Sequence, residues 1–488
     1  MIPKPASQHP FDGSLAIGEK TPITFHGVAG SKAAEGFARW LRLWMGWRLP
    51  TQEAEDPKPN GVHFSLEGAD ESLGDEGYEL LVAPTGAVVR ANGEAGLFYG
   101  GQTLACLVRE ATAGAGGQRS IPAAVVRDEP RFAWRESMLD CCRHMPSVAY
   151  IERHLDLMAL LKLNRFHWHL TEDQGWRIQI DRYPRLMEVA AYRKAENGAP
   201  YGGFYTKDEV RHIVRYAKER CIEVVPEIEM PGHSMAALAA YPELGCTGGP
   251  YEVGTKWGIY EDIYCAGNDA VFEFLQGVLE EVLELFPFGW VHIGGDEAPK
   301  ARWERCPKCQ ARIRAEGLKD EFELQSWFIR RMEAWLAERG RRLIGWDEIH
   351  EGGLPPSATV QWWRGWMKDV AVEAARHGHE IVSTPTSHCY LDYGYEEYSV
   401  EHTYGFDPIP EELDAAAAAK VLGGGGNMWT EHTPTEAEMD RQIWPRKAAI
   451  AECLWTPKEG KSWPDFERRL SGFQGLLKEL GVRYGPWV

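Results

Sequence analysis

The chain has 488 residues, of which 44% are hydrophobic and 26% charged, and its formal net charge is -19. This length and composition are typical of a globular protein with one large and one smaller domain. The acidic charge argues against nucleic acid as a partner, because phosphate binding needs clustered lysine and arginine. No run of about 18 apolar residues predicts a membrane helix, and residues 1–11 lack the apolar core of a secretory signal.

The ten cysteines are scattered along the chain. Without a secretory signal, this usage favours reduced thiols, and we expect a cytoplasmic location. Cys306 and Cys309 form a Cys-x-x-Cys pair, but no second pair with zinc-finger spacing follows it. A turn or a facultative disulfide is therefore favoured over a structural zinc ion, and we expect neither a metal site nor a cofactor.

Residues 1–125 are predicted to form a small α+β domain that supports the rest of the chain. Four strands are predicted from apolar alternation and two helices from amphipathic patterns. The strands lie at residues 22–25, 62–66, 78–82 and 87–91, and the helices at 32–47 and 97–109. The glycine-rich segment 113–118 is predicted to be a linker, with the domain boundary between residues 124 and 130.

Residues 126–488 alternate short apolar strands with amphipathic helices, which is the pattern of βα units. Eight strands are predicted, at residues 136–140, 165–170, 222–230, 290–297, 342–349, 359–364, 380–384 and 425–431. The longer helices are predicted at residues 148–163, 271–285, 321–338 and 371–377. The fold class is therefore α/β, a (β/α)8 TIM barrel preceded by the small α+β domain. An open doubly wound sheet is the alternative, but its usual Gly-x-Gly-x-x-Gly loop is not found.

The predicted strand at residues 290–297 ends in an unusual way. Its apolar residues lead through Gly294 and Gly295 into two adjacent carboxylates, Asp296 and Glu297. Glycines at a strand end allow a sharp turn, so acids beyond them can face one cavity. The alternative interpretation is a strand followed by a helix whose first turn favours Asp and Glu.

Polar and aromatic side chains follow all eight predicted strands. In chain order they are Asp140 and Arg143; His169, Glu172 and Asp173; Glu229 and His233; Asp296 and Glu297; Trp346 and Asp347; Trp362 and Trp363; Tyr390 and Asp392; and Trp429 and Glu431. Each has an ordinary structural explanation when taken singly, such as a helix cap or core packing. Because the carboxyl ends of barrel strands converge on one face, their recurrence predicts a single pocket.

A pocket that combines acids and indoles without a metal-ligand pattern indicates carbohydrate chemistry. Cleaving a glycosidic bond requires an acid that protonates the leaving oxygen and a group that stabilises the oxocarbenium-like charge. Two carboxylates in one desolvated site can have their pKa values driven apart, and Asp296 and Glu297 can divide the work in this way. Indoles would form an apolar wall. Arg135 is expected to donate two hydrogen bonds to neighbouring sugar hydroxyls.

Six motifs stand in order at or beside the predicted strand ends. They are HLTEDQGW at 169–176, PEIEMPGH at 226–233, HIGGDE at 292–297, GW at 345–346, YLD at 390–392 and NMWTE at 427–431. Together they resemble glycoside hydrolase family 20, the β-N-acetylhexosaminidases. The resemblance covers nearly the whole chain, because that family also carries a small α+β domain before its barrel.

The resemblance implies an exo-acting enzyme that releases terminal, non-reducing N-acetylglucosamine or N-acetylgalactosamine. In this family the substrate's own 2-acetamido oxygen attacks the anomeric carbon, which gives an oxazolinium ion and net retention. The resemblance implies Glu297 as general acid/base, Asp296 as the group that orients the acetamido nitrogen, and Tyr390 as the group that binds the acetamido oxygen. Around the sugar it implies Trp346, Trp363 and Trp429, and on its hydroxyls Arg135, Asp392 and Glu431. Asp173 is also implied at the substrate site, and together with Glu229 and His233 it would tune Glu297. Glu229 stands where aspartate is frequent in the family.

Two other function classes stay open as alternatives. A metal-dependent amidohydrolase is suggested by His167 and His169, which copy the His-x-His of such barrels, and a metal analysis would discriminate. A non-catalytic sugar-binding protein is the other, although it would have no use for the adjacent Asp296 and Glu297. The expected partner is a carbohydrate with a terminal β-linked N-acetylhexosamine. Neither nucleic acid nor a membrane is expected as a partner, and the sequence leaves the oligomeric state open.

Overall fold

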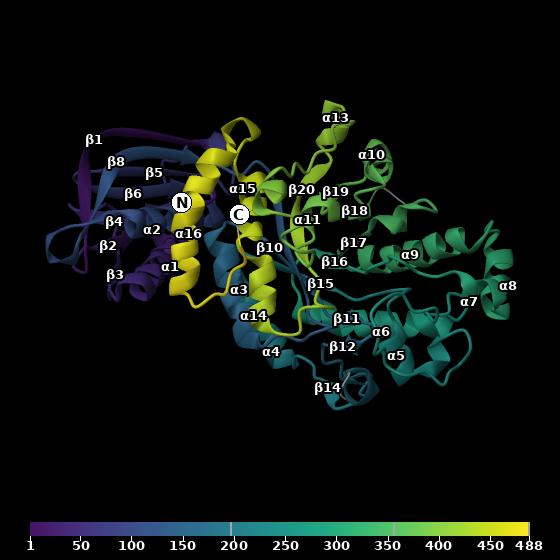
Figure 1. The fold of residues 1–488 in the computed structure, drawn as a ribbon. Helices are drawn as coiled ribbons and strands as arrows, with labels where there is room; N and C mark the ends of the chain where they lie inside the picture. Colours follow the sequence, from purple (N-terminus) through teal and green to yellow (C-terminus); the bar gives the residue numbers. More distant parts are fainter. Residues whose placement is uncertain (196–197, 355–356, 487–488) are drawn as a thin grey trace.

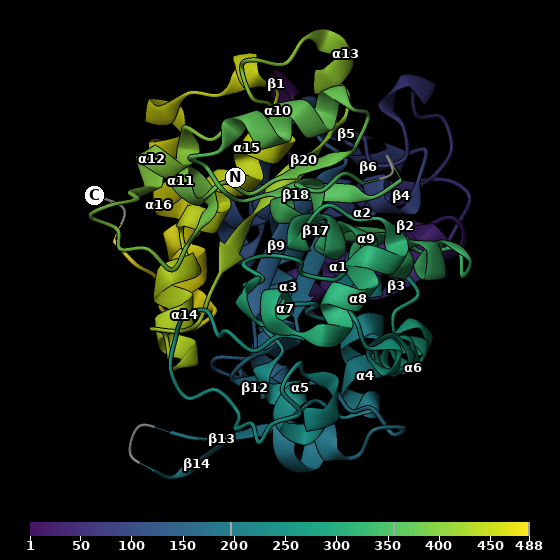
Figure 2. The same ribbon diagram turned by 90° about the vertical axis from the view of Figure 1, so that its right-hand side faces the viewer.

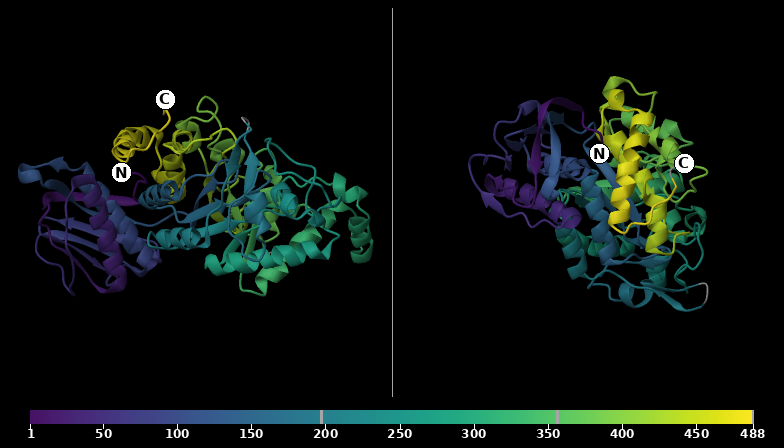
Figure 3. Two further views of the ribbon diagram at one scale, coloured as in Figure 1. Left: turned by 90° about the horizontal axis from the view of Figure 1, so that it is seen from below. Right: turned by 60° about the vertical axis from the view of Figure 1, so that its left-hand side comes forward.

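Two domains lie side by side in the computed structural model, which describes residues 1–195, 198–354 and 357–486 (Figure 1). The molecule is elongated, with the N-terminal domain at one end and the long loops and helices of the larger domain at the other (Figure 3). Among the described residues, no helix combines the length and apolar character needed to cross a membrane.

The N-terminal domain is a mixed sheet with two helices packed on it. The strand order is β1 (Ser7–Ile17), β8 (Arg119–Asp128), β5 (Tyr78–Ala83), β6 (Gly86–Ala91), β4 (Gly61–Ser65), β2 (Ile23–Phe25) and β3 (Thr51–Glu53). Helices α1 (Gly27–Met45) and α2 (Glu94–Glu110) pack against each other and against the sheet. The six elements predicted for this domain are all present.

The N-terminal sheet is larger than the sequence predicts. Strands β1 and β8 were not predicted, because β1 contains Pro10 and Gly13 and β8 contains Pro122, residues that disfavour strands. The predicted linker at 113–118 was wrong, since this segment leads from the short strand β7 (Thr112–Ala113) into β8, inside the domain. Strand β8 carries the sheet to residue 128, which lies within the range of 124–130 predicted for the domain boundary.

The larger domain is a closed barrel of eight parallel strands. In order around the barrel they are β9 (Trp134–Asp140), β10 (Arg165–His169), β15 (Glu223–Glu227), β16 (Trp290–His292), β17 (Arg342–Trp346), β18 (Thr359–Trp362), β19 (Ile381–Ser383) and β20 (Val421–Met428). All eight predicted strands are present, so the predicted TIM barrel is confirmed. The four predicted helices correspond to α3 (Val148–Leu160), α6 (Asp269–Leu285), α9 (Glu321–Ala337) and α10 (Lys368–Arg376).

Strand register fixes which residues emerge together at the barrel mouth. His169 pairs with Asp140 on one side and Glu227 on the other, and Glu227 pairs with His292. These four residues form one layer at or next to the carboxyl ends of neighbouring strands. The segments that follow them therefore leave the barrel at the same face, as barrel geometry requires.

The N-terminal domain closes the opposite end of the barrel. The Arg135 guanidinium donates to both oxygens of Glu76, at 2.9 and 2.8 Å. Lys162, just before β10, pairs with Asp128 at 2.8 Å. Helix α16 (Trp463–Glu479) lies between the two domains in Figure 1, where Glu479 pairs with Arg109 at 2.9 Å.

The prediction that Arg135 binds sugar hydroxyls was therefore wrong. Arg135 is the second residue of β9 and lies at the amino end of the strand, whereas the pocket forms beyond the carboxyl ends. Its side chain is fully buried, and it also donates to the carbonyl oxygens of Phe132 and Lys162. It holds the two domains together instead.

Glu76→Gln should destabilise the protein, because it leaves the buried Arg135 guanidinium without its anionic partner. Removing one member of a buried ion pair costs about 3–5 kcal/mol, and we expect the lower end of that range, since Glu76 keeps 23% of its side-chain exposure. Urea unfolding measures the loss. The control is Glu280→Gln, whose pair with Arg182 is half exposed and should contribute less than about 1 kcal/mol. Equal losses in the two variants would contradict this assignment.

Candidate active site

The turn after β16 brings Asp296 and Glu297 into the barrel mouth. Gly294 has a φ of 67°, and a Cβ atom there would lie 1.6 Å from a carboxylate oxygen of Glu229, so only glycine fits. Glu297 itself has a φ of 47°, a left-handed conformation that is strained for a residue with a side chain. Strain of this kind is concentrated at functional sites, where the surrounding structure maintains it.

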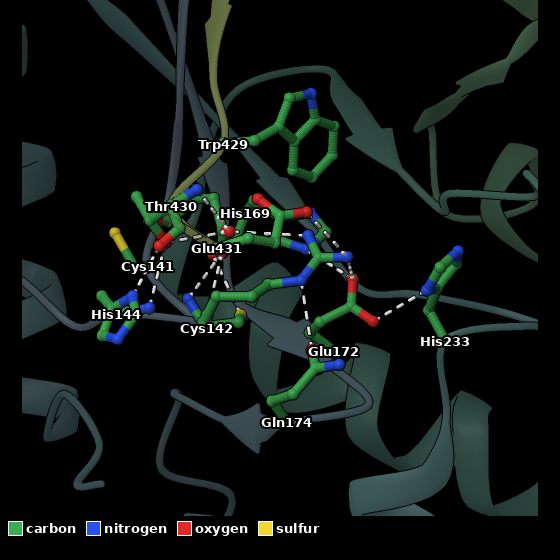
Figure 4. Close-up of polar contacts among 12 residues, drawn as sticks. Cys141, Cys142, His144, His169, Glu172, Gln174, His233, Trp429, Thr430 and Glu431 are labelled. Carbon is green, nitrogen blue, oxygen red and sulfur yellow. Dashed lines mark hydrogen bonds and ion pairs between the residues drawn. The ribbon is translucent and has the colours of Figure 1, made fainter. Parts of the chain in front are cut away.

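His233 stands beside both carboxylates. Its Nε2 atom lies 3.5 Å from an oxygen of Asp296 and 3.5 Å from an oxygen of Glu297. On its other side, Nδ1 donates to Glu172 at 2.7 Å (Figure 4). The same nitrogen lies 3.3 Å from Asp173. His233 also has a left-handed backbone, with a φ of 45°. The site is therefore a continuous series of carboxylate, imidazole and carboxylate.

Burial and neighbouring charges shift the pKa values of Asp296 and His233 away from their ordinary values. Burial raises the pKa of Asp296 to about 7, against the attraction of His233, and the neighbouring Glu297 adds to the rise. Although burial works in the opposite direction, Glu172 and Asp296 raise the pKa of His233 well above its ordinary value. The imidazolium is thus held in its charged form between two pairs of acids.

Glu229 lies behind this series and does not contact His233. Burial, Asp296 and Glu227 raise its pKa well above the ordinary value. Neither of its carboxylate oxygens has a hydrogen-bond partner among the described residues. The acid that holds His233 is Glu172 instead. Despite its burial, the pKa of Glu172 is held well below its usual range by Arg143 and His233.

Four aromatic side chains wall the pocket. The ring of Trp346 lies 5.8 Å from that of Trp429, and Tyr390 lies 6.1 Å from Trp363 and 6.2 Å from Trp429. Two of the indoles are fixed by acids outside the pocket: Trp346 donates to Glu227 and Trp363 to Glu348, each at 2.8 Å. Flat apolar faces held in this way suit the apolar side of a sugar ring or an acetyl methyl group.

The opposite rim is polar. The Arg143 guanidinium lies 2.9 Å from Glu172 and 3.8 Å from Glu431, and 5.1 Å from the centre of the Trp429 ring. Figure 4 shows Trp429, Glu431 and Glu172 gathered at this rim. Burial and the nearby Glu431 raise the pKa of Asp392 to about 8. One oxygen of Asp392 and the Trp429 indole N–H are buried without a partner among the described residues, so they are free to bind a ligand.

Most predicted site residues come together in one pocket of about 550 Å3. Its lining includes Arg143, His233, Asp296, Glu297, Trp346, Trp363, Tyr390, Asp392, Trp429 and Glu431. Asp173 and Glu229 lie behind it, and Arg135 lies at the far end of the barrel. The arginine that lines the pocket is Arg143, which follows the carboxyl end of β9. This position after the strand is the sequence feature that could have distinguished it from Arg135, which lies at the amino end.

The histidines of the amidohydrolase alternative lie below the pocket. Both ring nitrogens of His167 contact carboxylates, Nδ1 with Glu136 at 3.2 Å and Nε2 with Glu227 at 2.8 Å. Against the effect of burial, Glu227 and Glu136 raise the pKa of His167 to about 9. Both nitrogens of His167 are therefore engaged by carboxylates, as in a buried ion-pair network.

Comparison with known families matches both domains. The model described as glycosyl hydrolase family 20, catalytic domain, matches residues 132–458, and the model for domain 2 of the same family matches residues 1–129. The chain belongs to glycosyl hydrolase family 20. The two matches meet where β8 ends and β9 is about to begin, so the family's domain division coincides with the division seen in the fold.

Relatives within family 20 are similar over the whole chain. A Porphyromonas gingivalis beta-hexosaminidase is 43% identical over 99% of this chain, and the chain spans 64% of that protein, slightly under two thirds. A Vibrio harveyi GH20 exo beta-N-acetylglucosaminidase, solved in complex with N-acetylglucosamine, superimposes with a TM-score of 0.89 at 29% identity, covering 100% of this chain and 78% of that one. A mutant Streptomyces plicatus beta-hexosaminidase in complex with GlcNAc gives 0.87 at 32% identity, covering 100% and 97%.

Asp296→Asn should stabilise this family 20 protein at neutral pH. The folded-state pKa of Asp296, about 7, lies above the reference value of 3.8. The folded state therefore holds the proton more tightly, and the carboxyl group lowers stability progressively as the pH rises between these two values. In urea titrations, the variant and the unchanged protein should have similar unfolding free energies near pH 4. Above that pH, the variant's advantage should grow until about pH 7 and then level off, at a few kcal/mol.

Glu280→Gln, far from the pocket, serves as the control for Asp296→Asn and should follow the unchanged protein at every pH. A separation between Asp296→Asn and the unchanged protein that does not vary with pH would contradict the raised pKa.

Proposed function

We propose that the chain is an exo-acting β-N-acetylhexosaminidase that releases terminal, non-reducing N-acetylglucosamine or N-acetylgalactosamine from glycosides. The observation that carries the proposal is the placement of Asp296 and Glu297 against one nitrogen of His233, at an aromatic-lined pocket. Family membership and relatives called beta-hexosaminidase support it.

The reaction we propose is substrate-assisted hydrolysis with net retention. A conventional retaining glycosidase places its two carboxyl groups on opposite faces of the sugar, about 5–5.5 Å apart. Asp296 and Glu297 are neighbours in the chain, and each lies 3.5 Å from the same imidazole nitrogen. Family 20 is an exception to the two-carboxylate scheme, because its nucleophile is supplied by the substrate. The 2-acetamido oxygen of an N-acetylhexosamine is such a group, closing to an oxazolinium ion as the leaving oxygen departs.

Glu297 would act as the general acid and then as the general base. Its side chain keeps 34% of its exposure, against 12% for Asp296, so it can reach both the leaving oxygen and the incoming water. The surrounding structure maintains the strained backbone at Glu297 and His233, so the two side chains stand in this arrangement before substrate arrives.

Asp296 would receive the acetamido N–H. In the free site its pKa is about 7 because the carboxylate is desolvated. A hydrogen bond from the amide N–H, and the positive charge that develops on the closing ring, both favour the ionised form. The interaction therefore strengthens toward the transition state, which is what accelerates a reaction. Tyr390, whose burial raises its pKa well above the ordinary value, would remain a neutral donor to the acetamido oxygen.

The remaining pocket residues would bind the sugar. Trp346, Trp363 and Trp429 would enclose the acetyl methyl group and the ring. Arg143, Asp392 and Glu431 would contact the hydroxyls, with Arg143 in the role first expected of Arg135. Asp173 and Glu172 would orient His233 from behind, and Glu229 would fill the space beneath Gly294.

The cell compartment we propose is the cytoplasm. The ten cysteines all lie outside disulfide bonds in the structure, which is usual in a reducing compartment. We propose no cofactor for the reaction, because hydrolysis of a glycoside of the proposed kind needs none.

Glu297→Gln should remove general acid catalysis while leaving the fold intact. With alkyl or sugar leaving groups, which need protonation, kcat/KM should fall by about 10²–10⁴-fold. With nitrophenyl 2-acetamido glycosides the loss should be smaller, because nitrophenolate departs without a proton. The measurement is a panel of gluco- and galacto-configured substrates, with Glu280→Gln as the control of unchanged activity. Equal losses for good and poor leaving groups would argue against Glu297 as the acid, and an unchanged protein inactive on the whole panel would overturn the proposed function.

A further inference from the structure

Four cysteines gather in one cluster outside the pocket. Cys246 and Cys265 come from the long loop that follows β15, and Cys306 and Cys309 lie at the start of α8 (Pro307–Glu316). The Sγ atom of Cys265 lies 3.7 Å from that of Cys306 and 3.6 Å from that of Cys309, and the Sγ atoms of Cys246 and Cys309 are 3.8 Å apart. All four sulfur atoms lie within 4.8 Å of one another.

We propose that this cluster is a structural zinc site with four thiolate ligands. A zinc ion bonds cysteine sulfur at about 2.3 Å in a tetrahedron. The sulfur atoms of such a tetrahedron are about 3.8 Å apart, which follows from the same bond length. The three measured separations, 3.6 to 3.8 Å, match that edge. They do not match a disulfide, whose sulfur atoms are about 2.0 Å apart.

The arrangement of the sulfurs also favours one ion over two cross-links. Cys265 is nearly equidistant from Cys306 and Cys309, and Cys309 is close to both Cys265 and Cys246. The sulfurs therefore form a group of four rather than two separate pairs. Thiolate sets of this kind select zinc, copper(I) or iron, and four clustered sulfurs with three separations near a tetrahedral edge suit zinc.

The local fold brings the two arms together. Cys306 is the residue that precedes α8, and Cys309 lies in its first turn, where the positive end of the helix favours thiolates. On the other arm, Gly245 and Tyr264 pair as an isolated antiparallel bridge, and the amide of Cys265 donates to the carbonyl of Leu244 at 2.9 Å. These contacts hold together the two segments that carry Cys246 and Cys265. The arms then meet at Gly267.

Gly267 allows the close approach of the two arms. A Cβ atom there would lie 2.1 Å from the carbonyl carbon of Lys308 and 2.4 Å from the amide nitrogen of Cys309. No other residue would allow this contact without a shift of the backbone. The backbones of the two arms are therefore in contact beside the sulfur atoms, and a metal ion bound by the sulfurs would hold the arms together.

This geometry changes the interpretation of the Cys-x-x-Cys pair. The sequence shows no second pair with compact spacing after Cys309, and this absence favoured a turn or a disulfide. The missing ligands precede the pair, and 18 residues separate Cys246 from Cys265. Only the folding of the loop after β15 brings them to the other two.

The cluster fastens two loops that carry the site. The amide of Tyr264, next to Cys265, donates to the carbonyl of Pro231, two residues before His233, at 3.0 Å. Trp303, close before Cys306, donates from its indole to the carbonyl of Tyr264 at 2.9 Å. Trp303 belongs to α7 (Ala301–Arg305), which follows Glu297. In Figure 2, α5 (Met235–Ala240), α7 and α8 face the viewer at this end of the molecule. The zinc ion would therefore be a positioning device for His233 and Glu297 and would take no part in bond cleavage.

The test is a metal analysis of the full chain, purified under reducing conditions without added metal. We expect about one zinc ion per chain. After exchange for Co²⁺, the protein should show the intense visible bands of a tetrahedral thiolate complex. In the double variant Cys306→Ser with Cys309→Ser, the zinc content should fall at least tenfold. The control variant Cys106→Ser, whose thiol lies in α2, should keep its zinc.

Two further measurements keep the proposal open to refutation. Removal of zinc by a chelator should lower the unfolding midpoint by several degrees, and added zinc should restore it. If the double variant does not fold, the zinc content and the Co²⁺ spectrum of the unchanged protein decide alone. The proposal is overturned if reduced, unchanged protein neither holds nor takes up zinc while its cluster thiols react freely, or if mass spectrometry finds these cysteines paired as disulfides.

Discussion

The contact of one imidazole with two adjacent carboxylates is the constraint on which the rest of the site depends. His233 lies 3.5 Å from both Asp296 and Glu297, and the acids Glu172 and Asp173 contact its other nitrogen from behind. Two carboxylates so close together repel each other, and the imidazolium between them offsets that repulsion. One acid can then remain buried with a raised pKa while its neighbour stays accessible. A division of work between proton transfer and charge stabilisation follows from this difference in burial.

Much of the remaining structure maintains that contact. The barrel register brings the strand ends to one face, and the glycines after β16 allow the strained turn that presents Glu297. The N-terminal domain closes the far end through Arg135 and Glu76, and so holds the first strands in place from below. The cysteine cluster ties the loop of His233 to the segment that follows Glu297. Several parts of the structure thus maintain the strained, left-handed backbone of His233 and Glu297, as preorganised catalysis requires.

The sequence predicts most of this arrangement because periodicity and motif position are local properties. The eight strands and the two acids after Gly295 follow from them directly. What it misses depends on contacts between distant segments. Arg135 and Arg143 are eight residues apart, and only the start of β9 decides which one faces the pocket. Strand β8 is stabilised by pairing with β1 and β5 rather than by its own propensity, and the four cysteines meet only after the loops fold.

The role of the acetamido group is the central claim, and it is tested most directly by two aryl glycosides that differ only at C2. One carries the 2-acetamido group and the other a 2-hydroxyl, with the same leaving group and ring configuration. If the substrate supplies its own nucleophile, kcat/KM for the 2-hydroxyl compound should be lower by at least about 10³-fold, because an intramolecular nucleophile is worth many powers of ten in rate. Comparable rates for the two compounds, or a sugar found covalently attached to Asp296 by mass spectrometry, would contradict the account.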